Sequence, residues 1–126
     1  MQILELDHLQ LAMPAGTENQ ARAFYGGLLG FQECAKPEPL AMRGGCWFQC
    51  GPIQLHLGVE TPFVPARKAH PAFVVADIAA ARARLEQAGV ATTADDSVAG
   101  VRRFYAADPF GNRLEFIQNG DGFNQR

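Results

Sequence analysis

Apolar and polar residues alternate along several short stretches of the chain, and two longer stretches repeat apolar residues every three or four positions. Alternation with period two predicts half-buried strands, whereas the longer period predicts amphipathic helices. The helical pattern covers residues 17–31 and 78–89, and we expect Thr17 and Asp77 to cap the two helices. Residues 37–45, which hold two prolines and two glycines, indicate a loop.

These predicted elements occur twice in the same order. One strand, one helix and three further strands fill residues 3–58, and the same order fills residues 68–118. Such an internal repeat predicts two tandem βαβββ modules and an α+β fold class. We interpret residues 1–118 as one domain in which residues 59–67 link the two modules. Residues 119–126 form a C-terminal tail.

The turns of the last hairpin in each module determine which side chains share a face. The Asp-Pro-Phe-Gly-Asn stretch at residues 108–112 matches a tight turn that sets Tyr105 opposite Glu115. A Gly-Pro turn in the first module sets Trp47 opposite His56 in the same way. One face of each hairpin is then apolar, and the other carries polar and aromatic side chains. This mixed face predicts a lined cavity, although a solvated sheet face would alternate in the same way.

Composition and charge exclude several classes of partner. The chain has 126 residues, a formal net charge of −2 and no basic run, so we expect no nucleic-acid surface. No apolar stretch is long enough to cross a bilayer. The N-terminal stretch lacks a basic leader and an apolar core, which favours a cytoplasmic location. Three cysteines without CxxC spacing indicate reduced thiols.

The three histidines of the chain fall at related positions in the repeat. His8 and His70 occupy equivalent points on the two opening strands, and the counterpart of His56 is Glu115. A single histidine is more often a packed or surface residue than a ligand. Four ligand-type side chains in equivalent positions favour a metal site, and imidazole with carboxylate suits a divalent ion such as Zn, Mn, Fe, Ni or Co.

The modules and motifs resemble the vicinal oxygen chelate superfamily. The similarity rests on "DHLQLAM" at residues 7–13, "AHPAFVV" at residues 69–75 and "DPFGNRLEF" at residues 108–116, and it spans residues 3–118. That superfamily includes glyoxalase I, fosfomycin-modifying enzymes, extradiol dioxygenases, methylmalonyl-CoA epimerase and bleomycin-binding proteins. The resemblance implies a half-open, eight-stranded barrel-like sheet and a homodimer. It also implies a divalent metal ion held by His8, His56, His70 and Glu115.

A bound cation with open positions can bind two neighbouring oxygens of a substrate and stabilise the enolate or oxyanion that forms. We assign catalytic roles to Glu115, which can act as the base if it detaches partly from the metal, and to Tyr105, which can donate a hydrogen bond. The predicted substrate contacts are Trp47, Gln10, Gln54 and Arg103.

The leading hypothesis is a metal-dependent lyase or isomerase of glyoxalase type that acts on a small vicinal-oxygen substrate. Two differences from glyoxalase I oppose methylglyoxal–glutathione as that substrate: His56 stands where a carboxylate is common, and Ala12 where a basic residue is expected. The alternatives are a metal-free small-molecule binding protein of bleomycin-resistance type, a fosfomycin-modifying enzyme and a dioxygenase.

Overall fold

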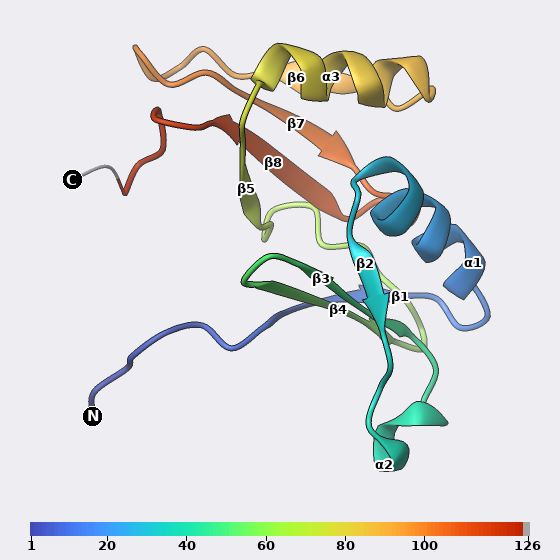
Figure 1. Cartoon of the computed structure of the whole chain (residues 1–126). Coiled ribbons are helices and arrows are strands. Elements are labelled where there is room, and N and C mark those ends of the chain that lie inside the picture. The colour runs from blue at the N-terminus through green and yellow to red at the C-terminus, as the bar shows by residue number, and fades with distance from the viewer. Residues whose placement is uncertain (125–126) are drawn as a thin grey trace. The chain divides into compact units, whose positions relative to one another are not determined.

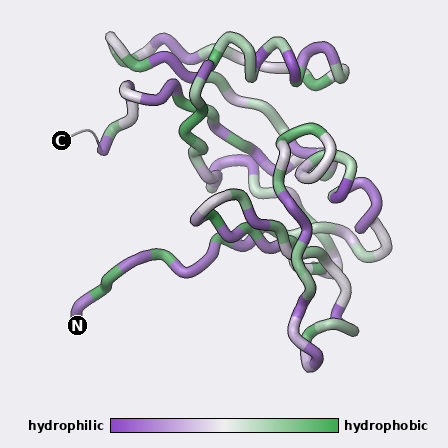
Figure 2. Tube along the Cα trace, viewed as in Figure 1, coloured by the Kyte–Doolittle hydropathy of each residue, from purple (hydrophilic) through white to green (hydrophobic). Residues whose placement is uncertain are grey.

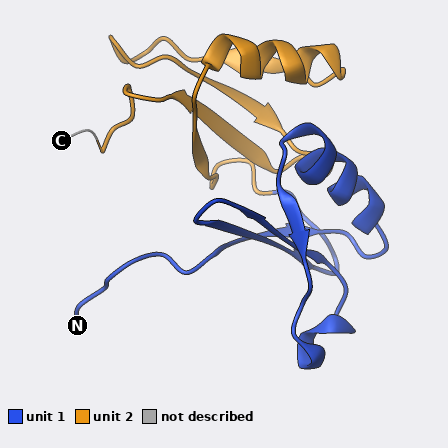
Figure 3. Cartoon of the chain, viewed as in Figure 1, with its two compact units in different colours: residues 1–65 blue, residues 66–126 orange. Residues whose placement is uncertain are grey.

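The computed structural model describes residues 1–124, and the chain divides into two compact units, residues 1–65 and 66–126 (Figure 3). The division falls inside the stretch predicted as the linker. Each unit contains one strand, then a helical segment, then three strands, and unit 1 has a further short helix between its second and third strands (Figure 1). The α+β class and the two tandem βαβββ modules are therefore confirmed. The final residues of the predicted tail, 125–126, lie outside the described residues.

Unit 1 contains a four-stranded sheet in the order β1-β4-β3-β2, in which β1 runs parallel to β4 and the other pairs are antiparallel. Its strands are β1 (Leu9–Met13), β2 (Gln32–Cys34), β3 (Cys46–Cys50) and β4 (Ile53–Val59). Its helices are α1 (Glu18–Ala21), the π-helical segment η1 (Arg22–Leu28) and α2 (Glu38–Ala41).

The first helix begins after Thr17 as expected, but it differs from the sequence expectation in its capping and in its winding. Thr17 makes no side-chain cap, because its hydroxyl donates to the carbonyl of Pro14 instead. Beyond α1 the chain widens into η1, and the N–H of Leu29 donates to the carbonyl of Phe24, five residues back. Such π-helical turns accommodate an extra residue in a helix. The short helix α2 also lies where the sequence predicts only a loop.

Unit 2 repeats the topology in the order β5-β8-β7-β6, again with one parallel pair, β5 with β8. Its strands are β5 (Ala72–Val75), β6 (Thr92–Ala94), β7 (Arg103–Ala107) and β8 (Arg113–Gln118). The helix α3 (Ile78–Gln87) lies along the sheet (Figure 1). Asp77 caps this helix as expected, because its carboxylate accepts from the N–H of Ala80.

Most of the apolar side chains predicted to share one face of each hairpin are buried, whereas Cys50 and Ile53, beside the turn in unit 1, are exposed. Phe48 and Leu55 are fully buried in unit 1, as are Phe104 and Leu114 in unit 2. Each contributes roughly 1.5–3 kcal/mol by leaving water. A one-residue slip of either hairpin would turn these side chains to the opposite face, so their burial fixes the strand register.

The turn between β7 and β8 is closed by a buried network. The N–H of Asp108 donates to the carbonyl of Asn112 at 2.9 Å, and one oxygen of Asp108 accepts from the N–H groups of Phe110 and Asn112. The Asn112 side chain, 0% exposed, donates to the second Asp108 oxygen at 2.9 Å and accepts from the N–H of Ala66 at 3.0 Å. Asn112 therefore joins the start of unit 2 to the turn that positions β8.

The segment before β1 exposes apolar side chains, whereas the segment after β8 is joined to unit 2 by an ion pair. Ahead of β1, hydrophobic and hydrophilic residues follow one another (Figure 2), and Ile3, Leu4 and Leu6 are exposed. After β8, the carboxylate of Asp121 binds the guanidinium of Arg102 at 2.8 Å. Across residues 1–124, no helix has the length and apolar character needed to span a membrane.

Candidate functional site

In unit 1, two of the predicted metal ligands lie in direct contact. His8 sits one residue ahead of β1 rather than on the strand, and its ring stacks on that of His56 from β4 with centroids 4.3 Å apart. The Nδ1 atom of His8 lies 2.8 Å from a carboxylate oxygen of Asp7. A carboxylate on one ring nitrogen orients an imidazole and directs its other nitrogen, here Nε2, toward a ligand.

His56 is buried between two aromatic neighbours. Its opposite face stacks on Trp47 of β3, with ring centroids 3.8 Å apart and planes 3° from parallel. Burial, and then the neighbouring His8, lower the pKa of His56, which favours the neutral form that a metal needs. Within the described part of unit 1, the ring nitrogens of His56 have no hydrogen-bond partner, so they are available to a ligand.

The predicted substrate contacts of unit 1 lie on the same face of the sheet as His56. The register pairs Gln10 with His56 in the parallel ladder and Gln49 with Gln54 in the hairpin. The Gln10 side chain crosses Gly58, where a Cβ atom would lie only 2.4 Å from the Gln10 amide nitrogen. Gln10 and Trp47 line a cavity of about 280 Å³ that also exposes Lys36 and Arg43.

In unit 2, the other two predicted ligands form a second pair. His70 precedes β5 by two residues, and its Nε2 atom lies 2.9 Å from an oxygen of Glu115, on β8. The Nδ1 atom of His70 lies 2.7 Å from the carbonyl oxygen of Lys68. Glu115 is 4% exposed, so its carboxylate is held among partners rather than in solvent.

Arg103 and Tyr105 complete the surroundings of Glu115. The guanidinium of Arg103 binds the second Glu115 oxygen at 3.3 Å and Asp95 at 3.1 Å, and it donates to the Tyr105 hydroxyl at 2.9 Å. Burial and the negative charge of Glu115 raise the pKa of Tyr105, so its hydroxyl keeps its proton at neutral pH. The Tyr105 ring meets that of His70 edge-on at 5.5 Å.

The donor set fits a divalent cation. Both His8 and His70 have Nδ1 next to an oxygen acceptor and present Nε2, the arrangement in which imidazoles bind metals. Two ligand atoms bound at about 2.1 Å on adjacent positions of one ion lie roughly 3 Å apart, close to the observed separation between His70 and Glu115. Within either unit, the described residues bring no three such ligands together, so each unit offers one pair.

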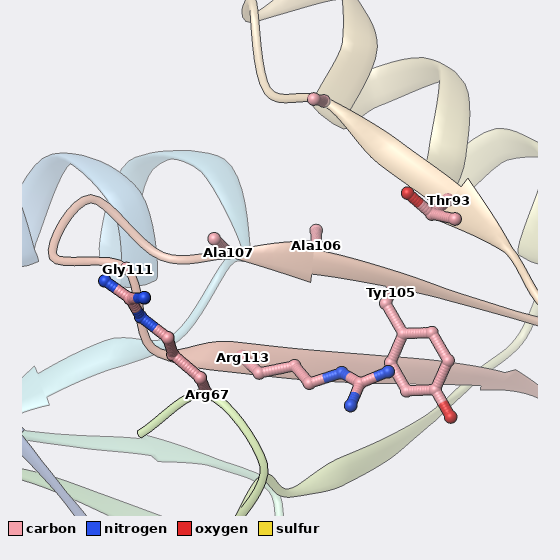
Figure 4. A pocket seen from close by; sticks show the side chains of 8 residues that line it. Arg67, Thr93, Tyr105, Ala106, Ala107, Gly111 and Arg113 are labelled. Carbon is pink, nitrogen blue, oxygen red and sulfur yellow. The ribbon is translucent and has the colours of Figure 1, made fainter. Parts of the chain in front are cut away.

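Unit 2 also contains a pocket of about 410 Å³ that the sequence interpretation did not assign (Figure 4). The register pairs Thr93 with Tyr105, Tyr105 with Glu115 and Ala107 with Arg113, so these side chains share the face that carries Glu115. The pocket is lined by Arg67, Ala91, Thr93, Tyr105, Ala106, Ala107, Gly111 and Arg113. The alternation along the last hairpin does place Arg113 on this face from the sequence alone, whereas no pattern in the sequence indicates Arg67.

The chain matches a known family over most of its length. The model of the Glyoxalase/Bleomycin resistance protein/Dioxygenase superfamily covers residues 5–116. The fold is similar to that of a glyoxalase-family protein from Bacillus anthracis, with 49% sequence identity, a TM-score of 0.90, and 94% of this chain and 98% of that chain covered. No curated protein sequence matches the chain.

Two more distant structures share the fold alone. The fosfomycin resistance protein FosX from Listeria monocytogenes is 17% identical, with a TM-score of 0.76 over 94% of this chain and 95% of that chain. The antibiotic binding protein TnmS3 from Streptomyces sp. CB03234 is 24% identical, with a TM-score of 0.71 over 94% of this chain and 98% of that chain. The shared architecture therefore occurs in proteins with different activities.

Proposed function

Because the chain belongs to the Glyoxalase/Bleomycin resistance protein/Dioxygenase superfamily, we propose that it is a metal-dependent lyase or isomerase of glyoxalase type. Its substrate is a small molecule with two neighbouring oxygens. The observation that carries the proposal is the pairing of ligand-type side chains in equivalent places of the two modules. One pair is His8 with His56, and the other is His70 with Glu115.

In this proposal His8, His56, His70 and Glu115 are ligands of a divalent ion from the group Zn, Mn, Fe, Ni and Co. When bound, the ion supplies Lewis-acid stabilisation to an oxyanion of the substrate. The imidazoles fit this role because oxygen atoms next to the Nδ1 atoms of His8 and His70 leave the Nε2 atoms for a metal, and the Nε2 atom of His70 already lies 2.9 Å from the second candidate ligand, Glu115. The low pKa of His56 keeps its ring neutral and able to coordinate.

The acid–base work falls to groups of unit 2. Glu115 accepts a proton from the substrate carbon next to the oxygens, and the same carboxylate returns it to the product. Arg103 holds one Glu115 oxygen at 3.3 Å and so fixes the direction of the other. The Tyr105 hydroxyl, protonated at neutral pH, donates a hydrogen bond to the oxygen that gains charge.

The first experiment measures metal binding by protein purified without a histidine tag. Glu115→Gln keeps the size of the side chain but removes its charge, so we expect the metal affinity to fall by about tenfold or more, as for changes in supporting groups. The exposed Glu86 on α3 gives the matched control, Glu86→Gln, which should bind metal as the parent does. Equal affinity in Glu115→Gln and in the parent would remove Glu115 from the ligand set.

The second experiment measures the reaction class. Proton abstraction from carbon exchanges a substrate C–H for C–D in D₂O, which NMR follows directly with small hydroxyketones and hemithioacetals. We expect exchange that requires added metal and is lost in Glu115→Gln. Oxygen uptake with catechols or thiol loss with fosfomycin, without such exchange, would contradict the proposal and favour a dioxygenase or a fosfomycin-modifying enzyme.

A second candidate is a metal-free small-molecule binding protein. It is supported by the stack of Trp47 on His56, a flat aromatic surface next to a cavity of about 280 Å³. The metal analysis also decides this case. Less than about a tenth of an ion per chain after metal loading and dialysis would favour the binding protein, because a structural or catalytic site retains its metal under these conditions.

The superfamily resemblance also leads us to propose a homodimer. Each four-stranded sheet leaves two edge strands, β1 and β2 in one and β5 and β6 in the other, and edges of this kind are often covered by a partner. Sedimentation equilibrium of the full chain measures the mass directly. A mass equal to that of one chain at micromolar concentration would rule the dimer out.

A further inference from the structure

We infer that the pocket of unit 2 binds an anionic oxygen group of the ligand, a carboxylate or a phosphate-type group, through Arg113 and Arg67. This inference deepens the proposed function and rests on it in one respect, namely that the same molecule reaches Glu115. The anion-binding pocket itself is argued from unit 2 alone.

Charge is the first argument. Within residues 66–124, neither Arg67 nor Arg113 has an acidic side chain within ion-pair distance. Three carboxylates of unit 2, those of Asp95, Glu115 and Asp121, are already engaged with other cations. Arg103 binds Asp95 and Glu115, Arg102 binds Asp121, and His70 contacts Glu115. Two guanidinium groups line the pocket without a neutralising carboxylate, which favours an anionic occupant.

The geometry of Arg113 is the second argument. Its guanidinium carbon lies 3.8 Å from the centre of the Tyr105 ring, so the flat face of the group stacks on the ring (Figure 4). Stacking uses the face and leaves the N–H groups at the edge free to donate. Those in-plane donors match the two oxygens of a carboxylate or phosphate. The ring also restricts the side chain before the anion arrives, which lowers the entropic cost of binding.

The lining of the pocket is the third argument. Its volume of about 410 Å³ lies within the usual range for small-molecule sites, roughly 300–1,000 Å³. Ala106, Ala107 and Gly111 have little or no side chain, so the strands leave room above them. Arg67 reaches toward Gly111 from the segment before β5, and Thr93 presents a hydroxyl on the same face (Figure 4).

Tyr105 connects this pocket to the candidate metal ligands. One ring contacts the Arg113 guanidinium at 3.8 Å and the His70 imidazole at 5.5 Å. The guanidinium carbon of Arg113 therefore lies no farther from the centre of the His70 ring than these two distances added together. A single small molecule can place its anionic group on Arg113 and its reacting atoms near His70 and Glu115. The pocket thus assigns a substrate class, a small oxygenated compound with a negative charge at one end.

Arg113 is better placed for this role than Arg103, which the sequence interpretation assigned to the substrate. The side chain of Arg103 is 12% exposed, and its guanidinium already binds Asp95, Glu115 and the Tyr105 hydroxyl. An anion that displaced these partners would leave carboxylates unpaired. Arg113 gives up no ion pair on binding, because it has none within the described residues of unit 2.

The test uses the full chain stripped of metal, so that its result does not depend on the cation. Backbone amide NMR spectra are recorded during separate titrations with sodium phosphate, sodium acetate and acetamide at constant ionic strength. We expect saturable shifts at Ala106, Gly111 and Arg113 with phosphate or acetate. The neutral acetamide, which has the size of acetate, should produce none.

Variants locate the site. Arg113→Gln and Arg67→Gln should each raise the half-saturating concentration by roughly tenfold, the effect of losing one charge-assisted hydrogen bond. Arg102→Gln removes a guanidinium that pairs with Asp121, outside the pocket, and should titrate as the parent does. The relative strength of phosphate and acetate identifies the anion, and either order supports the inference.

Shifts that do not saturate, that occur equally with acetamide, or that weaken equally in Arg102→Gln and Arg113→Gln would overturn the inference. The failure of the proposed function gives a different result. In that case Glu115→Gln binds metal as the parent does, while the metal-free titration still saturates and still depends on Arg113.

Discussion

Replacing Asn112 by alanine tests how the last hairpin is held in place. Asn112 is fully buried, and its side-chain hydrogen bonds include one to the Asp108 carboxylate at 2.9 Å and one from the N–H of Ala66 at 3.0 Å. Its own backbone groups pair with Asp108 across the turn and remain in the variant. Asn112→Ala therefore removes only the side-chain bonds.

The expected loss follows from those two bonds. A hydrogen bond to a charged group contributes about 1.5–3 kcal/mol, and a neutral one contributes about 1 kcal/mol. The variant also removes a partner from a buried carboxylate oxygen of Asp108 and from the N–H of the half-buried Ala66. We expect the free energy of unfolding of unit 2 to fall by about 2–4 kcal/mol.

Urea unfolding separates this effect from changes in unit 1. The single tryptophan, Trp47, belongs to unit 1, so its fluorescence follows that unit, whereas amide NMR peaks of β7 and β8 follow unit 2. The exposed Asn119 gives the matched control, and Asn119→Ala should change stability by less than about 0.5 kcal/mol. A loss below about 1 kcal/mol in Asn112→Ala would refute the reasoning, because it would mean that the buried network contributes little.

Two further predictions concern a backbone position and an ion pair. Gly45 has φ +85° and a Cβ atom there would lie 2.1 Å from the carbonyl oxygen of Leu57, so Gly45→Ala should lower the free energy of unfolding by about 2 kcal/mol or more. Gly51→Ala, at φ +55° with open space, should cost only about 1–2 kcal/mol, and equal losses in the two variants would show that the close contact has no effect. The hydrogen bond from Arg102 holds the pKa of Asp121 in the folded protein below its ordinary value. The pair therefore stabilises the fold fully when the pH is above the ordinary pKa of an aspartate, and this stabilisation is lost as the pH falls through the lowered pKa of the folded state. Carbon NMR should show the Asp121 pKa rising in Arg102→Gln, and an unchanged pKa would mean that the pair is absent in solution.

The hairpins are the part of the fold that the sequence predicts best. The turn residues Asp108 and Asn112 fix a register in which apolar and polar side chains separate cleanly, and the structure confirms Tyr105 opposite Glu115 and Trp47 opposite His56. The turn type and the alternation with period two both depend on residues that are adjacent in the sequence, so both can be recognised without coordinates. The internal repeat then predicts the same topology for both modules.

Features that no pattern of residue types encodes were not predictable. The π-helical segment η1 and the helix α2 leave no distinctive pattern in the sequence. The Thr17 hydroxyl donates to the carbonyl of Pro14 and so does not cap the first helix. The same limit applies to the arginines of unit 2. Sequence alone places Arg103 and Arg113 on one face, but the position of Asp95 decides that Arg103 is already engaged.

The assignment of the four predicted ligands remains a prediction, and the structure adds what surrounds them. The sequence places His8 and His70 on the opening strands, whereas both lie just before the strands begin. Their oxygen partners, the Asp7 carboxylate and the Lys68 carbonyl, are close in sequence. A carboxylate or carbonyl one or two residues from a histidine is too common to be selected as a signal without coordinates.

Because Gly58 has no side chain, a single substitution at this position can change which ligands unit 1 prefers. Its backbone conformation is open to alanine, yet an added methyl would sit 2.4 Å from the Gln10 amide nitrogen and force that carboxamide to swing away. A single substitution therefore exchanges a polar surface for an apolar one beside Trp47 while the ladder of β1 and β4 stays intact. Divergence of recognition among relatives can begin at such a place without any loss of architecture.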